Sequence, residues 1–439
     1  MLTFIAPLII YLLSFPIMIA TLFRVEIGIL FFILTTPIIV LKQKMILFPL
    51  GNHITDFLLL ALIIGWFLRA GREKARVFRS SPINVVVVLI VLGSIISLIR
   101  GITFMALPED MALMRLSLWK NFMILPVIYF ISINNIEKEE LVKLIIACIC
   151  FSLIAMDFNF YSTFRWIKGG HYLHSLRISG PFAFLGPNEL GIFYSMYTFL
   201  LLGISYFIKN KKAKYLILFV CACNFYPILY SYSRSGYICT LVGIFTLGLL
   251  KDRKLFILLV ALLIFYKFIL PTSVVERIDG TFLDKEEISE EQARESVFEF
   301  GDVQVEVTGR KHLWEKAIRY FEQEPILGIG FDSFRQSQGA ITHGIFHRIL
   351  AEEGLVGMTI FSMFIITVLW QSYRLFRHSK SRLGQGIGLG FFTCVVIHLV
   401  GSITGDTFVY YNMMAIYWLF LGVVASFNAR DRSEKPSHV

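Results

Sequence analysis

The chain has 439 residues, of which 56% are hydrophobic and 16% are charged, whereas soluble proteins carry about 25% charged residues. The mean hydropathy of +0.70 indicates that lipid surrounds most of the chain. This composition excludes soluble enzymes, fibrous proteins and disordered tails. The net charge of +10 requires no nucleic-acid partner, because membrane proteins concentrate Lys and Arg in their cytoplasmic loops.

Apolar stretches recur along the chain, most of them close to the length at which a helix crosses the hydrocarbon core. They predict an all-α polytopic membrane protein with about 12 or 13 transmembrane helices. The number depends on whether residues 1–41 cross the membrane once or twice. The stretches are 2–22, 27–41, 54–68, 83–99, 116–133, 141–160, 187–208, 215–231, 236–250, 255–270, 355–373, 385–403 and 411–427.

Basic residues gather in five connecting segments, namely 69–79, 209–214, 251–254, 374–382 and 430–435. If the predicted helices alternate in direction, all five lie on one side, which the positive-inside rule identifies as the cytoplasm. The long segment 271–354 then lies outside. The predicted domains are an N-terminal helix bundle (1–270), an outer loop domain (271–354), C-terminal transmembrane helices (355–429) and a cytoplasmic tail (430–439).

The long outer segment differs from the rest of the chain in its charge. Residues 272–310 include eleven acidic and four basic residues, so this part is expected to be water-soluble. Residues 284–299 are compatible with a helix, and 303–307 alternate as a short strand would. A second helix is predicted from Arg310, and Pro325 ends it.

Two outer segments carry arginines beside predicted helix starts. Arg177 precedes the Pro187-Asn188 pair, which suits a helix N-terminus, where free backbone N–H groups favour an anion. Arg234 lies in the turn Ser233-Arg234-Ser235-Gly236 between two spans, so it is expected to be paired or to hold an anion. Each feature alone also fits a capped loop or an arginine that reaches the membrane interface.

A third outer group surrounds the point where the chain re-enters the membrane. Arg310 begins a predicted helix, and Pro325-Ile326-Leu327-Gly328-Ile329-Gly330 follows it. His343 then lies at the mouth of the next span, where a neutral imidazole can accept a proton from a hydroxyl at near-neutral pH. A histidine in this place also fits a capping or packing role.

The sequence predicts neither a metal site nor a cofactor, because it contains no phosphate-binding loop and its cysteines lie inside apolar spans. The outer side of the membrane has no ATP, so a reaction there needs a substrate that is already activated. A polyprenyl-diphosphate sugar meets this need. Its diphosphate is the leaving group, and its tail lies in the bilayer.

Together these motifs resemble the O-antigen ligase and O-antigen polymerase superfamily. The resemblance rests on Arg310, on the Pro325–Gly330 motif, on His343 and on the run Glu352-Glu353-Gly354-Leu355-Val356-Gly357. The Ser233-Arg234-Ser235-Gly236 turn and the Arg177 to Asn188 stretch are two further marks of that family. The motifs span roughly 177–357, and the helix pattern extends the likeness over nearly the whole chain.

The resemblance implies a glycosyltransferase-C-like fold in the bacterial inner membrane, with a periplasmic loop domain and a periplasmic active site. It implies metal-independent transfer of a glycan from undecaprenyl diphosphate, as in lipopolysaccharide biosynthesis. Arg177, Arg234 and Arg310 would hold the diphosphate, and His343 would activate the acceptor hydroxyl. Asn188, His347 and Glu352 are candidates for supporting roles. Gly344 replaces the Asn that usually follows the family's His, which makes His347 a rival base.

The same chemistry serves three acceptors: lipid A-core for a ligase, a lipid-linked repeat for a polymerase, and a protein hydroxyl for an oligosaccharyltransferase. We favour the ligase, with the lipid bilayer and the two glycolipids as partners and no nucleic acid. A transporter of lipid-linked glycans is the alternative from another class. It predicts ionisable residues at mid-membrane and related halves, whereas Asp157 and Glu189 lie near span ends and no repeat is visible.

Overall fold

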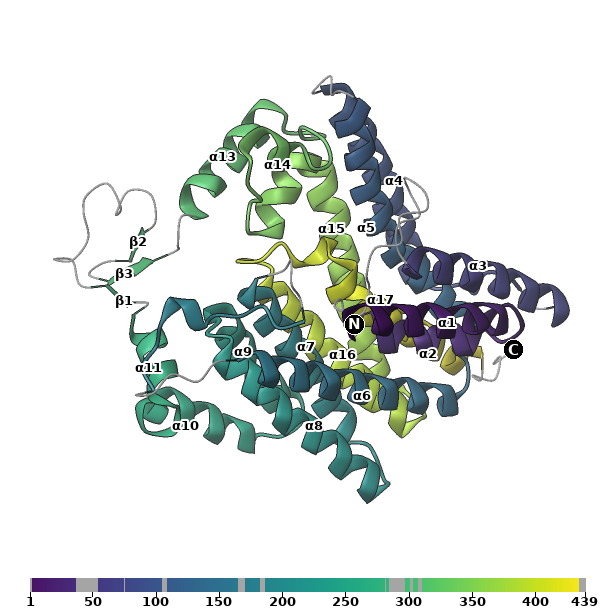
Figure 1. Ribbon diagram of the computed structural model, residues 1–439, viewed down its shortest axis with the longest axis horizontal. Coiled ribbons are helices and arrows are strands. Elements are labelled where there is room, and N and C mark those ends of the chain that lie inside the picture. The colour runs from purple at the N-terminus through teal and green to yellow at the C-terminus, as the bar shows by residue number, and fades with distance from the viewer. Residues whose placement is uncertain are drawn as a thin grey trace, which may run out of the picture.

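The computed structural model describes residues 2–36, 54–74, 76–104, 109–164, 170–181, 186–280, 282–283, 297–300, 303–306 and 310–433. Most of these residues are helical (Figure 1). The membrane-type helices are α1 (Leu2–Phe23), α2 (Val25–Thr35), α3 (Ile54–Arg72), α4 (Pro82–Phe104), α5 (Glu109–Asn135), α6 (Glu139–Thr163), α7 (Pro187–Ser205), α8 (Lys211–Tyr230), α9 (Arg234–Leu250), α10 (Lys254–Ile269), α15 (Ile345–His378), α16 (Arg382–Gly401) and α17 (Tyr411–Ser433).

The fold confirms an all-α polytopic membrane protein. Among the described residues, eight helices are long and apolar enough to span a membrane: α3, α4, α5, α6, α8, α15, α16 and α17. A ninth span results if α10 and α11 (Thr272–Asp279), which meet at 111°, are taken as one bent unit. The other predicted stretches are also helical, except that residues 37–41 lie outside the described part. Of these helices, α2 and α9 are short, and α7 begins with Pro187, Asn188 and Glu189.

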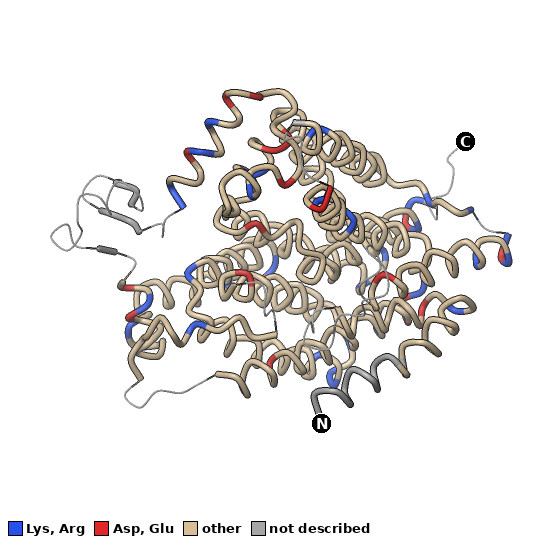
Figure 2. The backbone as a smooth tube through the Cα atoms, turned by 45° about the horizontal axis from the view of Figure 1, so that its top comes forward, with Lys and Arg blue, Asp and Glu red and all other residues tan. Residues whose placement is uncertain are grey.

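Charged residues avoid the middle of most helices. Figure 2 shows long uncharged stretches of helix, with Lys, Arg, Asp and Glu gathered mostly near helix ends and in the connecting segments. The most deeply buried helices are α7 and α17, whose residues are nearly all inaccessible. The outer helices expose apolar side chains instead. Such exposed apolar side chains suit contact with lipid.

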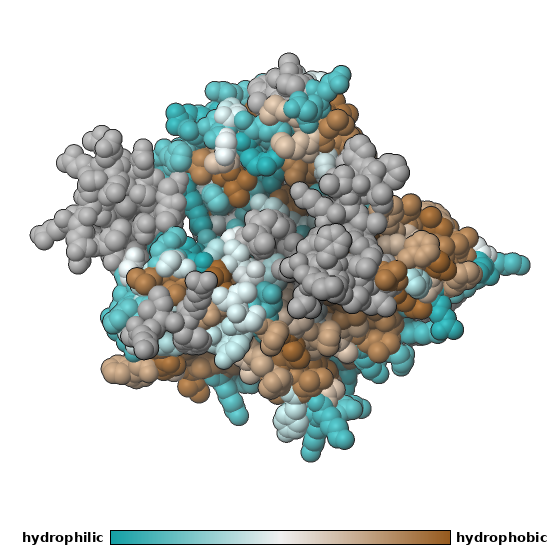
Figure 3. All heavy atoms as spheres, in the orientation of Figure 1, coloured by the Kyte–Doolittle hydropathy of each residue, from teal (hydrophilic) through white to brown (hydrophobic). Residues whose placement is uncertain are grey.

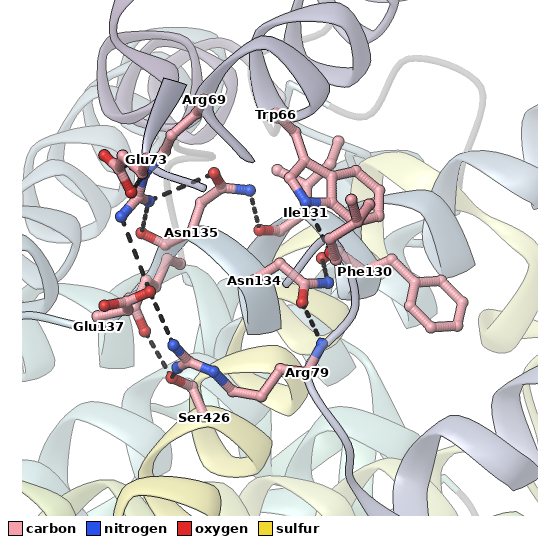
Figure 4. Close-up of polar contacts among 12 residues, drawn as sticks. Trp66, Arg69, Glu73, Arg79, Phe130, Ile131, Asn134, Asn135, Glu137 and Ser426 are labelled. Atoms are coloured by element: carbon pink, nitrogen blue, oxygen red, sulfur yellow. Dashed lines mark hydrogen bonds and ion pairs between the residues drawn. The ribbon is translucent and has the colours of Figure 1, made fainter. Parts of the chain in front are cut away.

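A polar cluster ties three helix ends together at the predicted cytoplasmic side (Figure 4). Arg79 Nη2 lies 2.7 Å from Glu137 Oε1, and Arg79 Nη1 donates to Ser426 Oγ of α17 at 2.9 Å. Arg69 of α3 donates from Nη1 to the Asn135 carbonyl of α5 at 3.1 Å. Two of the basic residues that predicted the orientation therefore also fix the ends of α3, α5 and α17 relative to each other.

The outer segment forms two small units. Three short strands, β1 (Phe282–Leu283), β2 (Val297–Phe300) and β3 (Val303–Glu306), pair antiparallel in the order β1-β3-β2. The predicted strand at 303–307 is confirmed as β3. The predicted helix at 284–299 is wrong at its end, because 297–299 pair with β3, and 284–296 lie outside the described part.

The second unit contains α13 (Arg310–Gln323) and α14 (Ser333–Gln338), which pack on the start of α15. Its small core consists of Leu313, Ala317, Ile329, Phe334 and Ala351. Figure 3 shows hydrophilic residues over α13 and α14 at the top of the view, and apolar residues over α1 to α3 at the right. This contrast places α13 and α14 outside the apolar bundle.

Candidate functional site

The N-termini of α7 and α9 meet because glycines allow the two helices to touch. A Cβ atom on Gly191 would lie 2.8 Å from the Ser233 Cβ, and one on Gly236 would lie 2.9 Å from the Gly191 Cα. No larger residue fits at this crossing without displacing backbone. The free N–H groups of both helix starts are therefore brought to the same region, where they favour negative charge.

Asn188 links the first two predicted motifs. Arg177 Nη2 donates to the Asn188 Oδ1 at 2.9 Å, and Ser233 Oγ donates to the same oxygen at 3.3 Å. Ser233 also caps α9 by accepting from the Gly236 N–H at 3.0 Å. Arg177 and the turn that carries Arg234 are thus held together.

Arg277 is a further arginine in this region, and the sequence analysis missed it. It lies on α11, where its guanidinium covers the Tyr172 ring at 5.1 Å and its Nε donates to the Tyr232 carbonyl at 3.3 Å. Burial and the nearby charge of Arg277 lower the pKa of Arg177. The Arg177 Nε is buried and has no hydrogen-bond partner among the described residues. Two like charges held this close favour an anion between them.

Arg310 extends the cluster from the outer unit. It is the first residue of α13, and its guanidinium forms no hydrogen bond or ion pair with the part of the chain that the structure describes. Burial lowers the pKa of Arg310, Arg177 lowers it further, and Glu189 of α7 acts in the opposite direction. Arg310 therefore lies close to the N-terminus of α7 and to Arg177, although 133 residues separate the two arginines in the chain.

His343 lies near enough to Arg310 for the arginine charge to act on its ring. Its backbone is in the left-handed region, with φ at +53°, which few residues other than glycine adopt. The half-buried ring forms no hydrogen bond with any described residue. Burial and the charge of Arg310 lower the pKa of His343, while Asp406 raises it. The imidazole is therefore neutral at neutral pH and free to accept a proton.

The segment 402–410, between α16 and α17, joins the histidine to the arginine motifs (Figure 1, yellow). The Ser402 carbonyl accepts from the Ile345 N–H at 3.0 Å, two residues after His343. Thr404 Oγ1 lies 2.7 Å from Ser235 Oγ, one residue after Arg234. This segment carries none of the predicted site residues, yet it fixes the distance between two of the predicted motifs.

His347, the rival base, is packed against another ring. Its imidazole lies parallel to the Trp314 indole, with centroids 4.7 Å apart and planes 2° apart. The Trp314 Nε1 donates to the Thr342 carbonyl at 2.9 Å, so the indole is itself fixed. The His347 Nδ1 is buried without a hydrogen-bond partner among the described residues. This geometry favours packing over proton transfer for His347.

Glu352 belongs to a buried ionic network. It accepts from the Asp332 N–H at 2.9 Å and the Phe334 N–H at 3.2 Å, and its Oε2 lies 2.9 Å from Arg348 Nε. Arg348 Nη1 also lies 2.8 Å from Asp406 Oδ2. Glu352 therefore holds the start of α14 against α15. This position favours a structural role for Glu352 over contact with substrate.

The two glycine-rich motifs are halves of one backbone joint. Helix α15 breaks at Gly354, whose φ of 63° and ψ of −154° suit only glycine. The carbonyls freed before the break accept from Ile329 and Gly330 N–H, both at 2.9 Å. The N–H groups freed after it, of Leu355 and Val356, donate to the Pro325 and Ile326 carbonyls at 2.8 and 3.1 Å. The joint explains why these motifs occur together.

An apolar groove of about 750 Å³ runs beside the site between α8, α9 and α10. Its apolar lining includes Leu218, Phe225, Ile244, Leu258 and Leu262. Tyr237 and Ile278 also line it, and Ile278 directly follows Arg277 in the chain. Helix α10, which contributes Leu258 and Leu262 to the lining, has no buried residue.

Part of the chain matches the model of a known protein family. Residues 216–362 match the model of the family described as O-antigen ligase, and this match confirms the predicted resemblance. The matched region covers about a third of the chain. It contains Arg234, Arg310 and His343 but neither Arg177 nor Asp406. No curated protein matches the chain.

Proposed function

We propose that this relative of the O-antigen ligases is an inverting glycosyltransferase that moves a glycan from undecaprenyl diphosphate to an acceptor hydroxyl. The observation that carries the proposal is the convergence of Arg177, Arg310 and the Arg234 turn on two helix N-termini beside a neutral His343. We place the reaction on the periplasmic side of the bacterial inner membrane.

The donor diphosphate is the anion that this cluster would hold. A guanidinium can donate two hydrogen bonds to two phosphate oxygens at once. The three predicted arginines and Arg277 would each offer such a pair of donors. Charge develops on the diphosphate as it leaves the anomeric carbon, so fixed cations stabilise the transition state more than the bound donor. The proposal assigns this task to the arginines and to no metal ion or cofactor.

The apolar groove fits the polyprenyl tail of the donor. Its lining includes Tyr237 and Ile278, the residue next to Arg277, so a tail in the groove would bring its diphosphate toward the arginines. Helix α10 has no buried residue, so the tail would enter the groove from the bilayer on the side of this helix. A lipid with a charged head suits this arrangement, whereas a free sugar nucleotide would leave the groove unused.

His343 would be the general base. It takes the proton from the acceptor hydroxyl, the acceptor oxygen forms a bond to the anomeric carbon, and the diphosphate leaves with the electron pair of the broken bond. Attack from the side opposite to the diphosphate inverts the anomeric centre. The lowered pKa of His343 keeps it ready to accept the proton.

The periplasmic location is supported by the distribution of basic residues. Helix α4 runs from Pro82, near the cluster of Arg69 and Arg79, to Gly101 near Phe331 of the outer unit. The basic segments and the arginine site therefore lie at opposite ends of the helices, and the positive-inside rule places the basic end in the cytoplasm. The division at 270, 354 and 429 follows this orientation and stays a prediction.

The acceptor within this proposal is lipid A-core, which makes the protein an O-antigen ligase. A polymerase, which extends a lipid-linked repeat, and an oligosaccharyltransferase, which modifies a protein hydroxyl, share the same chemistry. Product analysis of the reconstituted protein with a lipid-linked donor separates them. A single glycan on lipid A-core supports the ligase, whereas a ladder of growing lipid-linked chains would contradict the ligase assignment.

A further inference from the structure

A second pocket lies at the other end of the helices, on the predicted cytoplasmic side. It has a volume of about 630 Å³ and lies between the turn that joins α1 to α2, the end of α3 and the start of α6. Arg72 of α3 donates from Nη2 to the Phe23 carbonyl at the end of α1, at 2.9 Å. Arg69 donates to the Asn135 carbonyl at the end of α5, at 3.1 Å (Figure 4). These bonds fix the helix ends around the pocket, and the proposed glycan transfer uses none of the residues that line it.

The lining of this pocket changes from charged to apolar along the helices. Arg24 and Lys138 are the residues that precede α2 and α6, and both line the pocket. Ile27 lies one turn further along α2, and Leu141 and Leu144 lie one and two turns further along α6. Leu144 is 54% exposed, and at 1.5 Å per residue it lies about 9 Å deeper than Lys138. The pocket therefore has the polarity of a phospholipid, whose headgroup lies at the membrane surface and whose chains lie below it.

Three of the acidic residues that line the pocket already have basic partners. Glu73 Oε2 lies 3.0 Å from Arg69 Nε, and Glu137 Oε1 lies 2.7 Å from Arg79 Nη2. Glu140 pairs only with a lysine of its own helix, at 4.0 Å. These carboxylates are therefore neutralised within the protein and do not compensate the other basic residues of the pocket.

The remaining charged residues of the lining are three basic side chains and one acidic side chain, namely Arg24, Arg72, Lys138 and Glu26. None of the four forms an ion pair with the part of the chain that the structure describes. Arg72 uses only Nη2 for the Phe23 carbonyl, so its Nε and Nη1 remain for a ligand. Arginine and lysine bind phosphate through charge-assisted hydrogen bonds, and a carboxylate accepts them from an ammonium group. Basic pockets between helices on the cytoplasmic side are sites for lipid headgroups.

We propose that this pocket binds phosphatidylethanolamine from the cytoplasmic leaflet. Its phosphate lies among Arg24, Arg72 and Lys138, and its ammonium group donates to Glu26. The headgroup of phosphatidylglycerol has no cation for Glu26, and that of phosphatidylcholine carries methyl groups in place of the N–H donors. The bound lipid holds the turn between α1 and α2 against the start of α6, at the end of the helices opposite to the arginine site.

The test is native mass spectrometry of the delipidated full-length protein in detergent. Phosphatidylethanolamine, phosphatidylglycerol or phosphatidylcholine with the same acyl chains is added, and the affinity of the first bound lipid is measured. We expect phosphatidylethanolamine to bind at least about tenfold more tightly than the other two. The double variant Arg24→Gln with Lys138→Gln should lose about tenfold or more in affinity, because it removes two of the three cations. Glu26→Gln should abolish the preference for phosphatidylethanolamine over phosphatidylglycerol.

Lys212→Gln is the matched control, because Lys212 is an exposed basic residue of the segment 209–214 and does not line the pocket. We expect it to bind lipid as the wild type does. The side chains of Arg24 and Lys138 form no cap hydrogen bond, so the unfolding temperature without lipid should also stay unchanged in the double variant. Equal affinity of the wild type for the three lipids overturns the proposal, and so does an equal loss of affinity in Lys212→Gln and the double variant. No glycan is present in this experiment, so its result does not depend on the proposed function.

Discussion

The imidazole of His347 lies parallel to the indole of Trp314, with ring centroids 4.7 Å apart. The ring four residues away, that of His343, stacks on no ring in the described part of the chain, and the charge of Arg310 lowers its pKa. Two histidines that are nearly equivalent in the sequence therefore have different surroundings. One packs the outer unit against α15, and the other is half-buried without a hydrogen bond to any described residue.

This contrast predicts that His347→Phe retains most transfer activity, because phenylalanine keeps a flat ring against Trp314. His347→Ala should instead lose the stacking and about 1 kcal/mol of stability. Thermal unfolding in detergent and the initial rate of transfer check both expectations. A His347→Phe protein that folds normally but has no activity would make His347 the base.

The lowered pKa of His343 predicts a broad pH range of activity. The base acts when neutral, so kcat/KM should be constant through neutral pH and fall only below the ordinary histidine value of 6.5. A bound diphosphate adds negative charge beside the ring, which raises the pKa of His343. The acid limb of kcat should therefore lie at higher pH than that of kcat/KM. A kcat/KM midpoint above pH 7 would contradict this assignment.

Gly354→Ala should destabilise the protein by about 1–3 kcal/mol or more, because the residue has a φ and ψ that suit only glycine. Its Cβ would also lie 2.5 Å from the Ile326 carbonyl oxygen. Gly71→Ala is the matched control, since a Cβ there has no atom within 4 Å. Unfolding temperatures of the two variants measure the difference. Equal stabilities would mean that the α15 joint is not rigid.

Arg310→Lys should reduce kcat about tenfold to a hundredfold, because lysine keeps the charge but loses the two-point grip on phosphate. Arg253→Lys is the control, since Arg253 is exposed at the start of α10, among the basic loops. Steady-state kinetics with purified lipid-linked donor compare the two variants. Full activity of Arg310→Lys would contradict the two-point grip and would mean that Arg310 acts only through its charge.

The helices were largely predictable from the sequence. An apolar stretch in lipid must form its backbone hydrogen bonds within itself, and a helix does this. The residues Arg177, Arg234, Arg310 and His343 could be selected from motifs and from their common side of the membrane. Glu352 was selected in the same way. Its bonds to the Asp332 and Phe334 N–H groups favour a structural role, and no local pattern reveals this.

Contacts between distant segments could not be predicted. Asp406 stands alone in an outer loop of the sequence, and the Ser402 to Ile345 hydrogen bond and the Arg348–Asp406 ion pair bring this loop to the start of α15. Arg277 lies in an acidic stretch that looked like a solvated surface. The Gly191 and Gly236 crossing depends on two helices meeting, which requires the packed structure.

Glycan transfer by wild type and His343→Ala tests the central claim most directly. Both proteins are reconstituted with undecaprenyl-diphosphate glycan and lipid A-core, and the product is measured at neutral pH. We expect glycosylated lipid A-core with the wild type and at least about a hundredfold less with a folded His343→Ala protein. Equal product from both proteins would contradict the proposed mechanism.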